Sequence, residues 1–183
     1  MEIILIRHGK PTAANNPRLS ASGFAEWVER YNQSDIDPSS LPPKGLNSSL
    51  EGYFIVTSQL PRAIDSAEIC LNKKPDLILS RLNEMPLPCY NFPFILKAYT
   101  WLVIHRILWM LGISGRVESF KSAKIRAKKT AIQLHKLAIE HKKVAVFGHG
   151  LLNKYIAKEL TKLGANQTIS GKGFWSAIRL TFS

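Results

Sequence analysis

Short apolar runs alternate with amphipathic stretches along the chain. The runs have the length of buried strands, and they predict strands at residues 2–6, 53–57, 77–79, 144–147 and 177–182. Between them, apolar positions recur with a helical period and predict helices at residues 20–33, 61–72, 95–111, 118–141 and 151–163. Strands that alternate with helices need crossover connections, so the pattern predicts an α/β fold with a central, mainly parallel sheet flanked by helices.

The length of 183 residues is that of one domain with a sizeable core. We expect a single domain over residues 1–183, with an aromatic cap or insertion at about residues 85–117. The Pro- and Ser-rich stretch 35–49 has too little chain before it to be a domain linker, so it is expected to be a surface loop.

Two of the predicted strands run directly into a histidine beside glycine. The first gives Arg7-His8-Gly9 and the fourth gives Gly148-His149-Gly150. Parallel strands present their carboxyl ends at one edge of a sheet, where α/β folds bind their ligands. The adjacent Arg7 indicates an anionic ligand. The pattern therefore predicts a phosphate site with a histidine nucleophile.

A second cationic residue follows another predicted strand. Pro61 suits the first turn of a helix, and this places Arg62 beside the free N–H groups at the helix start. Both the helix N-terminus and a guanidinium favour phosphate oxygens.

In their order along the chain, these motifs resemble those of the histidine phosphatase superfamily, also called phosphoglycerate mutase-like. The family motifs Arg-His-Gly, Leu-Ser-x-x-Gly, Ser-x-Leu-x-Arg-Ala followed by Ser-Ala, Leu-x-Glu, Glu-Ser and Gly-His-Gly are matched at residues 7–9, 19–23, 58–63, 66–67, 82–84, 118–119 and 148–150. The resemblance spans residues 3 to about 155. It implies a three-layer sandwich of the phosphoglycerate mutase-like type and the activity of a phosphatase.

The resemblance also implies a role for each matched residue. His8 is the expected nucleophile, forming a phosphohistidine that water hydrolyses. Arg7, Arg62 and His149 are expected to bind the phosphate oxygens. Glu84 is expected to protonate the leaving oxygen and then to activate water, with His149 completing the catalytic set. No metal and no organic cofactor are expected.

Some residues depart from the family pattern. Lys10-Pro11 stand where many members have Glu or Gln, and the loop between Gly9 and Leu19 is shorter than in the mutases. A mutase must hold and reorient a bisphosphorylated intermediate, so the short loop and short chain favour a phosphatase acting on a small-molecule phosphate ester.

Other interpretations compete with this one. A short member of the family can also be a protein phosphohistidine phosphatase, with the basic C-terminal third docking an acidic phosphoprotein. The chain can also be a non-catalytic phospholigand-binding protein, although a pure binder has no need of the acid Glu84. Two histidines and a carboxylate can hold zinc, but Arg7 and Arg62 would repel a divalent cation.

The net charge of +12 is concentrated in the C-terminal third. Residues 121–183 hold 13 Lys+Arg against 2 Asp+Glu, whereas residues 1–120 hold 12 against 11. Many of these lysines lie off the apolar stripe of the predicted helix 118–141, which is typical of a solvated face. The positive charge of this region can also attract anionic substrates. No aromatic residues interleave with the lysines, so nucleic-acid binding is not expected.

The segment 92–113 is strongly apolar. Pro93 and the His105-Arg106 pair argue against a membrane span, so a buried helix or a lid is favoured. A helix lying on a membrane surface, with Trp101 and Trp109 as anchors, is a less favoured alternative. The aromatic residues of the insertion either pack the cap, which is favoured, or select a hydrophobic leaving group; they are Tyr90, Phe92, Phe94, Tyr99, Trp101 and Trp109.

The two cysteines carry little functional information. Cys70 falls on the apolar side of a predicted helix and is expected to be a small buried residue. The chain enters its first strand without a signal sequence, so we expect a cytoplasmic protein without a structural disulfide.

Overall fold

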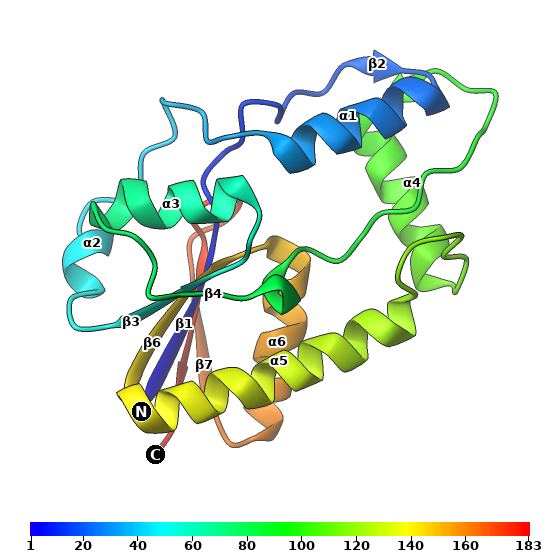
Figure 1. Cartoon of the computed structure of the whole chain (residues 1–183). Coiled ribbons are helices and arrows are strands. Elements are labelled where there is room, and N and C mark those ends of the chain that lie inside the picture. The colour runs from blue at the N-terminus through cyan, green and yellow to red at the C-terminus, as the bar shows by residue number, and fades with distance from the viewer.

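A six-stranded sheet forms the centre of the computed structural model, which describes residues 1–183 (Figure 1). Its strands, in the spatial order β4-β3-β6-β1-β8-β7, are β4 (Leu77–Ile78), β3 (Phe54–Thr57), β6 (Lys143–Gly148), β1 (Glu2–Arg7), β8 (Ala177–Thr181) and β7 (Asn166–Ser170). The first four are parallel to one another, and β8 and β7 join them as an antiparallel hairpin. The mainly parallel sheet predicted from the sequence is confirmed.

Six α-helices surround this sheet. They are α1 (Ala21–Gln33), α2 (Leu46–Ser49), α3 (Pro61–Leu71), α4 (Ala98–Met110), α5 (Phe120–His141) and α6 (Gly150–Lys162). A 3₁₀ turn, η1 (Ser80–Leu82), precedes the cap, and a separate two-stranded ribbon pairs β2 (Arg18–Leu19) with β5 (Leu96–Lys97).

The alternation of side chains along the buried strands produces three layers. Ile3 and Leu5 of β1 pack with the alanine-rich face of α5 and with α6. Ile4 and Ile6, on the other side of the same strand, pack in the cluster that contains Ala67 of α3. Successive strand residues point to opposite faces, so a run of four apolar residues needs helices on both sides. The three-layer α/β sandwich predicted from the sequence is confirmed.

Helices α1 and α4 form a smaller cluster above the carboxyl ends of the parallel strands (Figure 1). Phe24 and Trp27 of α1 pack there with Trp101 of α4. His105 of α4 is fully buried and stacks on Phe24 with ring centroids 5.1 Å apart. This cluster provides one wall of the space in which β1 and β6 end.

The predicted elements differ from the observed ones in a few places. The helix predicted at 95–111 begins only at Ala98, because Leu96–Lys97 pair with Arg18–Leu19. Strand β7 was not predicted, because its residues are mostly polar and all exposed at the edge of the sheet. The stretch 35–49, expected to be a loop, ends in the single-turn helix α2.

The apolar segment 92–113 forms β5, α4 and the turns that flank them. Trp101 and Trp109 are fully buried, so the idea that they anchor the chain to a membrane is wrong. The indole N–H of Trp101 donates to the carbonyl of Leu19, and that of Trp109 donates to the carbonyl of Glu118. No helix is long and apolar enough to cross a membrane.

Candidate active site

The register of β1 and β6 brings the two histidines together. Arg7 is paired with Gly148, so the residue after each one, His8 and His149, lies at the same edge of the sheet. Their ring centroids are 5.1 Å apart. This is the arrangement predicted from the two strand-end motifs.

His8 is held in one tautomer. Its Nδ1 lies 2.7 Å from the carbonyl oxygen of Gly9, which can only accept, so Nδ1 carries the proton. The lone pair is then on Nε2, to which Arg62 Nε donates at 3.3 Å. A histidine with its proton fixed on Nδ1 and an unprotonated Nε2 is the form required of a nucleophile.

His8 is neutral in its folded environment. Burial lowers its pKa to about 3, and the positive charges of Arg62 and Arg7 act in the same direction. The hydrogen bond to Gly9 opposes this shift only in part. The imidazole therefore keeps its lone pair throughout the physiological pH range.

Glycine at position 9 is required by a close approach. A β-carbon there would lie 2.7 Å from the indole of Trp175, and the Gly9 N–H donates to Ser66 Oγ at 2.9 Å. Trp175 itself has a positive φ of 59°, which is strained for a bulky residue. Its N–H donates to the carbonyl of Arg7 and its indole donates to Ser40 Oγ, contacts that hold this conformation.

Arg62 lies in the first turn of α3, as predicted, with Pro61 at the helix start. Its side chain is buried, and its Nη1 donates to the carbonyls of Tyr31 and Asn32 at 3.2 Å. The end of α1 therefore aims the guanidinium at His8. The carbonyls that hold it were not predicted, because they belong to the backbone and leave no mark in the sequence.

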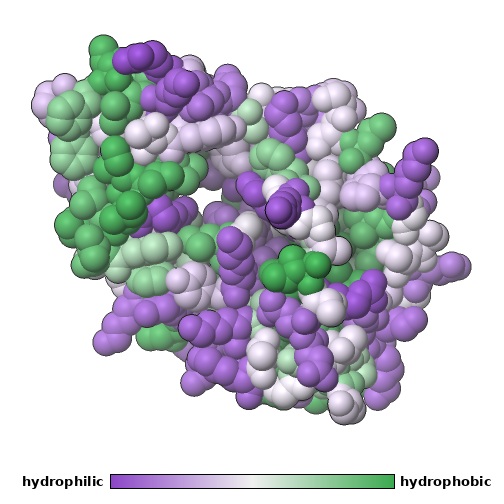
Figure 2. Space-filling view, turned by 180° about the vertical axis from the view of Figure 1, so that it is seen from behind, coloured by the Kyte–Doolittle hydropathy of each residue, from purple (hydrophilic) through white to green (hydrophobic).

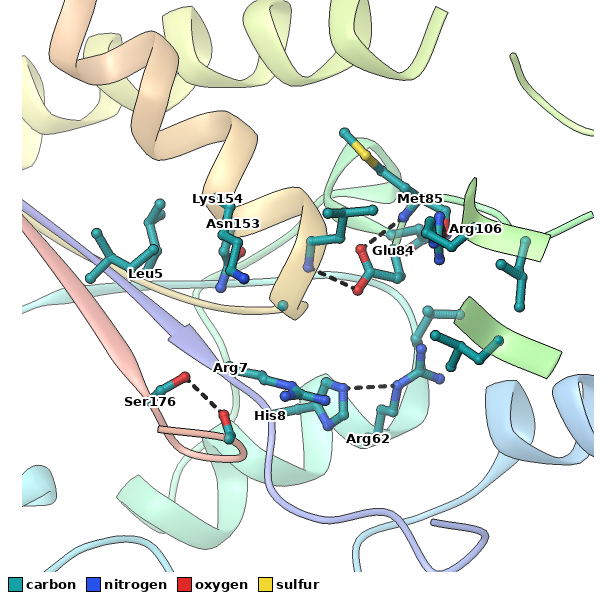
Figure 3. A pocket seen from close by; sticks show the side chains of 18 of the residues that line it. Leu5, Arg7, His8, Arg62, Glu84, Met85, Arg106, Asn153, Lys154 and Ser176 are labelled. Carbon is teal, nitrogen blue, oxygen red and sulfur yellow. Dashed lines mark hydrogen bonds between the residues drawn. The ribbon is translucent and has the colours of Figure 1, made fainter. Parts of the chain in front are cut away.

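Arg7 is held by an aromatic ring rather than by an acid. Its guanidinium carbon lies 4.4 Å from the ring centroid of Phe174, and its Nε is buried without a hydrogen-bond partner in the protein. The side chain points toward His8 (Figure 3). Phe174 belongs to the β7–β8 turn and was not predicted as a site residue.

His149 lies beneath His8 rather than at the cavity surface. Its Nε2 is 2.7 Å from the hydroxyl oxygen of Ser58, whereas its buried Nδ1 has no partner in the protein. Burial holds the pKa of His149 well below its usual value, and the neighbouring His8 and Arg62 add to this effect. His149 is thus a neutral imidazole with one uncommitted nitrogen.

Glu84 lies on the opposite side of the cavity from His8 (Figure 3). Its Oε1 accepts the backbone N–H groups of Leu152 and Met85, and its Oε2 accepts that of Leu151 at 3.2 Å. The carboxylate therefore caps the start of α6, a favourable place for negative charge. Because Oε2 accepts only one of these bonds, it retains a lone pair for a proton.

An ion pair behind Glu84 fixes the segment that carries it. Arg126 Nη2 lies 2.8 Å from Glu118 Oε2, and Nη1 of the same arginine donates to the carbonyls of Arg81 and Asn83. Glu118 was matched to the family pattern, and in the structure its carboxylate binds Arg126. Asn83 is held further by the N–H of Gln59, which donates to its side chain.

The residues around His8 line a cavity of about 900 Å³. Its cationic side chains outnumber its single acid, Glu84; they are Arg7, Arg62, Arg106, Lys154 and Lys172. Lys154 and Lys172 come from the basic C-terminal third, whereas the lysines of α5 do not reach the cavity. Such a charge balance suits an anionic ligand.

One wall of the cavity is apolar. It is built by α1, the segment after Glu84 and α4, through Trp27, Val28, Met85, Pro86, Leu87 and Leu102. None of the six aromatic residues singled out in the insertion lines this cavity, and Trp101 and Trp109 are fully buried in the packing. The favoured interpretation, that the aromatics pack the cap, agrees with the burial of Trp101 and Trp109, whereas Phe94 and Tyr99 are largely exposed.

Arg106 stands at the edge of the apolar wall. It donates to the carbonyls of Met85 and Pro86, and its guanidinium lies 4.9 Å from the ring centroid of Trp109.

The chain brings no three histidine, cysteine, aspartate or glutamate side chains close enough together to hold a metal ion.

The family model of the histidine phosphatase superfamily (branch 1) matches residues 46–172. This range includes Arg62, Glu84 and His149, and the fold brings them to His8, which lies before it. The chain belongs to the histidine phosphatase superfamily. A search of curated protein sequences finds no match.

Solved structures of phosphatases superpose on almost the whole chain and share its fold. A phosphoserine phosphatase from Entamoeba histolytica, in complex with 3-phosphoglyceric acid, is 17% identical with a TM-score of 0.60, covering 97% of this chain and 89% of that one. A putative alpha-ribazole-5'-P phosphatase from Escherichia coli is 16% identical with a TM-score of 0.60, covering 100% and 96%. At such identities the likeness shows the fold, which is phosphoglycerate mutase-like.

Proposed function

We propose that this protein is a phosphatase that hydrolyses a phosphomonoester through a covalent phosphohistidine on His8. The observation that carries the proposal is the state of His8: a buried, neutral imidazole whose Nε2 lone pair meets the guanidinium of Arg62 in a cationic cavity. Membership of the histidine phosphatase superfamily supports the same chemistry.

In the first step, Nε2 of His8 attacks phosphorus as the bond from phosphorus to the ester oxygen breaks. Arg62 and Arg7 bind the equatorial oxygens, where positioned cations stabilise the charge of the transition state. His149 does not line the cavity, but its ring adjoins His8 and its Nδ1 is uncommitted, so we assign it a donor role toward the phosphoryl group once phosphorus is bonded to His8. The alcohol leaves with a proton from Glu84, which acts as the general acid of this step.

In the second step, water attacks phosphorus on the face that the alcohol has left. Glu84, now a carboxylate, removes the proton from this water, and the nitrogen–phosphorus bond breaks. Inorganic phosphate is released and His8 is again neutral. Besides the ester itself, water is the one group from outside the chain that these two steps use.

The cavity favours a small-molecule phosphate ester over a protein substrate. His8 is only 2% exposed and lies within a cavity walled on one side by Trp27, Leu87 and Leu102. A phosphohistidine on a folded protein surface would have to reach past this wall. The apolar wall indicates an alcohol with a hydrocarbon or ring portion.

The decisive experiment is hydrolysis of an aryl phosphate in the presence of EDTA by the wild type, His8→Ala and His135→Ala. We expect turnover that resists EDTA and is lost in His8→Ala. His135 is partly buried on α5 and packs on Phe182, outside the cavity, so His135→Ala is a matched control that keeps activity.

Trapping the intermediate adds a second readout. Acid-labile, alkali-stable label from a radioactive phosphate ester should accumulate on the wild type and be absent from His8→Ala. Turnover without such a label, or turnover by His8→Ala, would contradict the proposed nucleophile. Phosphate protection of both proteins without any turnover would favour the phospholigand-binding alternative.

A further inference from the structure

Helix α4 exposes an apolar face to solvent. Residues spaced by three or four positions along it are largely exposed, among them Val103 at 53%, Ile107 at 52% and Leu111, just beyond its end, at 74%. We call this surface the α4 face; it consists of Phe94, Ile95, Tyr99, Val103, Ile107, Met110, Leu111 and Ile113. Figure 2 shows a continuous hydrophobic area over α4.

The side chains on the opposite side of α4 pack within the fold or line the cavity. Trp101, His105 and Trp109 are buried, and Leu102 and Arg106 line the cavity. The α4 face is therefore not a part of the core left uncovered by a missing neighbour within the chain. Monomeric proteins rarely expose contiguous apolar areas of this kind unless the area binds something.

The charged residues that flank the ends of the α4 face, along the chain and across the β2–β5 ribbon, are positive. Lys97 is the residue before α4, Arg18 is its partner across the β2–β5 ribbon, and Arg116 follows the helix; all three are exposed. Residues 85–117 contain no aspartate or glutamate. An apolar helix face with a cationic rim complements a surface that is apolar inside and anionic at its boundary.

We propose that the α4 face binds an anionic lipid membrane, with the helix lying in the plane of the interface. The aliphatic side chains enter the boundary between headgroups and acyl chains, and Arg18, Lys97 and Arg116 meet the anionic headgroups. This places the cavity, which shares α4 as a wall, close to the membrane surface. The proposal does not depend on the catalytic activity.

A second copy of this chain fits the α4 face less well. In a two-fold contact the same surface meets itself, so an antiparallel pair of α4 helices would set Lys97 of one copy near Arg116 of the other. No acid in residues 85–117 offsets that repulsion. An anionic bilayer removes the conflict because it presents only negative charge.

The test is co-sedimentation of the full chain with vesicles of phosphatidylcholine alone and of phosphatidylcholine mixed with phosphatidylglycerol. We expect binding to the mixed vesicles, weaker binding at high salt and little binding to phosphatidylcholine alone. The double variant Val103→Glu/Ile107→Glu should reduce the partition coefficient at least about tenfold. Lys97→Ser/Arg116→Ser should weaken binding to the mixed vesicles only.

Ile69→Glu/Ile78→Glu is the matched control, because these isoleucines are similarly exposed but lie on α3 and β4. It should bind like the wild type. Circular dichroism verifies that every variant folds. The proposal is overturned if the wild type binds neither vesicle, or if the α4 variant binds as well as the wild type, which would assign binding to the lysines of α5. It is also overturned if the wild type forms a dimer that does not bind vesicles and if the double substitution Val103→Glu/Ile107→Glu dissociates this dimer.

Discussion

The hydroxyl of Ser58 lies 2.7 Å from Nε2 of His149, so a hydrogen bond joins the start of α3 to this imidazole. Ser58 Oγ also accepts the N–H of Leu60 at 3.3 Å, and we infer that its own hydrogen is donated to Nε2 of His149. His149 then carries its proton on Nδ1, the nitrogen without a partner in the protein. A backbone turn at the start of α3 thereby prepares a donor next to His8.

Replacement of Ser58 by alanine should lower kcat while changing KM much less. Without the hydroxyl, both tautomers of His149 become accessible, and the donor to the transition state is lost for part of the population. The loss of one such hydrogen bond costs about 1 kcal/mol, which corresponds to roughly fivefold in rate. Steady-state kinetics on an aryl phosphate measure it, and Ser58→Thr, which keeps the hydroxyl, should retain most activity. A rise in KM with an unchanged kcat would contradict a role in the transition state.

Replacement of Glu84 by glutamine should slow hydrolysis by about 10²- to 10⁴-fold, the usual range for loss of a general acid. The amide oxygen can take the place of Oε1 and still accept the N–H groups of Leu152 and Met85, so the fold should persist. The effect should be larger for alkyl phosphates than for nitrophenyl phosphate, since a good leaving group needs little protonation. Equal losses for the two esters would show that Glu84 acts only as a helix cap.

A methyl group at position 9 should disturb the site through Trp175. The added β-carbon of Gly9→Ala would meet indole atoms at 2.7 and 2.9 Å, so the ring or the strand end must move. We expect a loss of about 1–3 kcal/mol in stability and a fall in kcat. Gly23→Ala is the control: it lies in α1 with its nearest contact at 3.5 Å, and alanine there should stabilise the protein. Thermal denaturation compares the two.

The strand-end histidines could be predicted because their geometry follows from chain direction alone. Once β1 and β6 are parallel neighbours, His8 and His149 must meet at one edge, and Pro61 places Arg62 at a helix start. Each histidine adjoins its own strand in sequence, and Pro61 adjoins Arg62, so local patterns were enough to place them. The family motifs then connected Glu84 to the same site, although the sequence alone gave no sign of its bonds to Leu151 and Leu152.

The supporting residues could not be predicted because each contact joins distant segments. Phe174 reaches Arg7 only because the β7–β8 hairpin lies beside β1, and the polar β7 resembles a loop in the sequence. Arg126 binds Glu118 and two carbonyls near Glu84, a role no local pattern marks. The aromatic insertion also illustrates this limit: its composition was visible, but the division of α4 into buried, cavity-lining and exposed sides required the fold.

Acid should destabilise the protein through His8. The unfolded imidazole has a pKa near 6.5, whereas burial lowers the folded value to about 3. Between these pH values the unfolded state binds a proton that the folded state does not. The contribution of His8 to the free energy of unfolding is therefore fully present above pH 6.5 and falls as the pH drops toward 3. Each such group contributes a slope of about 1.4 kcal/mol per pH unit.

Urea unfolding at several pH values between 4 and 8 measures this slope for the wild type and His8→Gln. Glutamine does not titrate, so the variant should lose stability less steeply below pH 6.5 by up to about 1.4 kcal/mol per unit. Ser66→Ala removes the buried hydroxyl that bonds Gly9 and Arg62 but no titrating group, so it should lower stability equally at every pH. If His8→Gln keeps the wild-type slope, the acid sensitivity comes from other groups, and His8 is not the buried neutral base that the nucleophile requires.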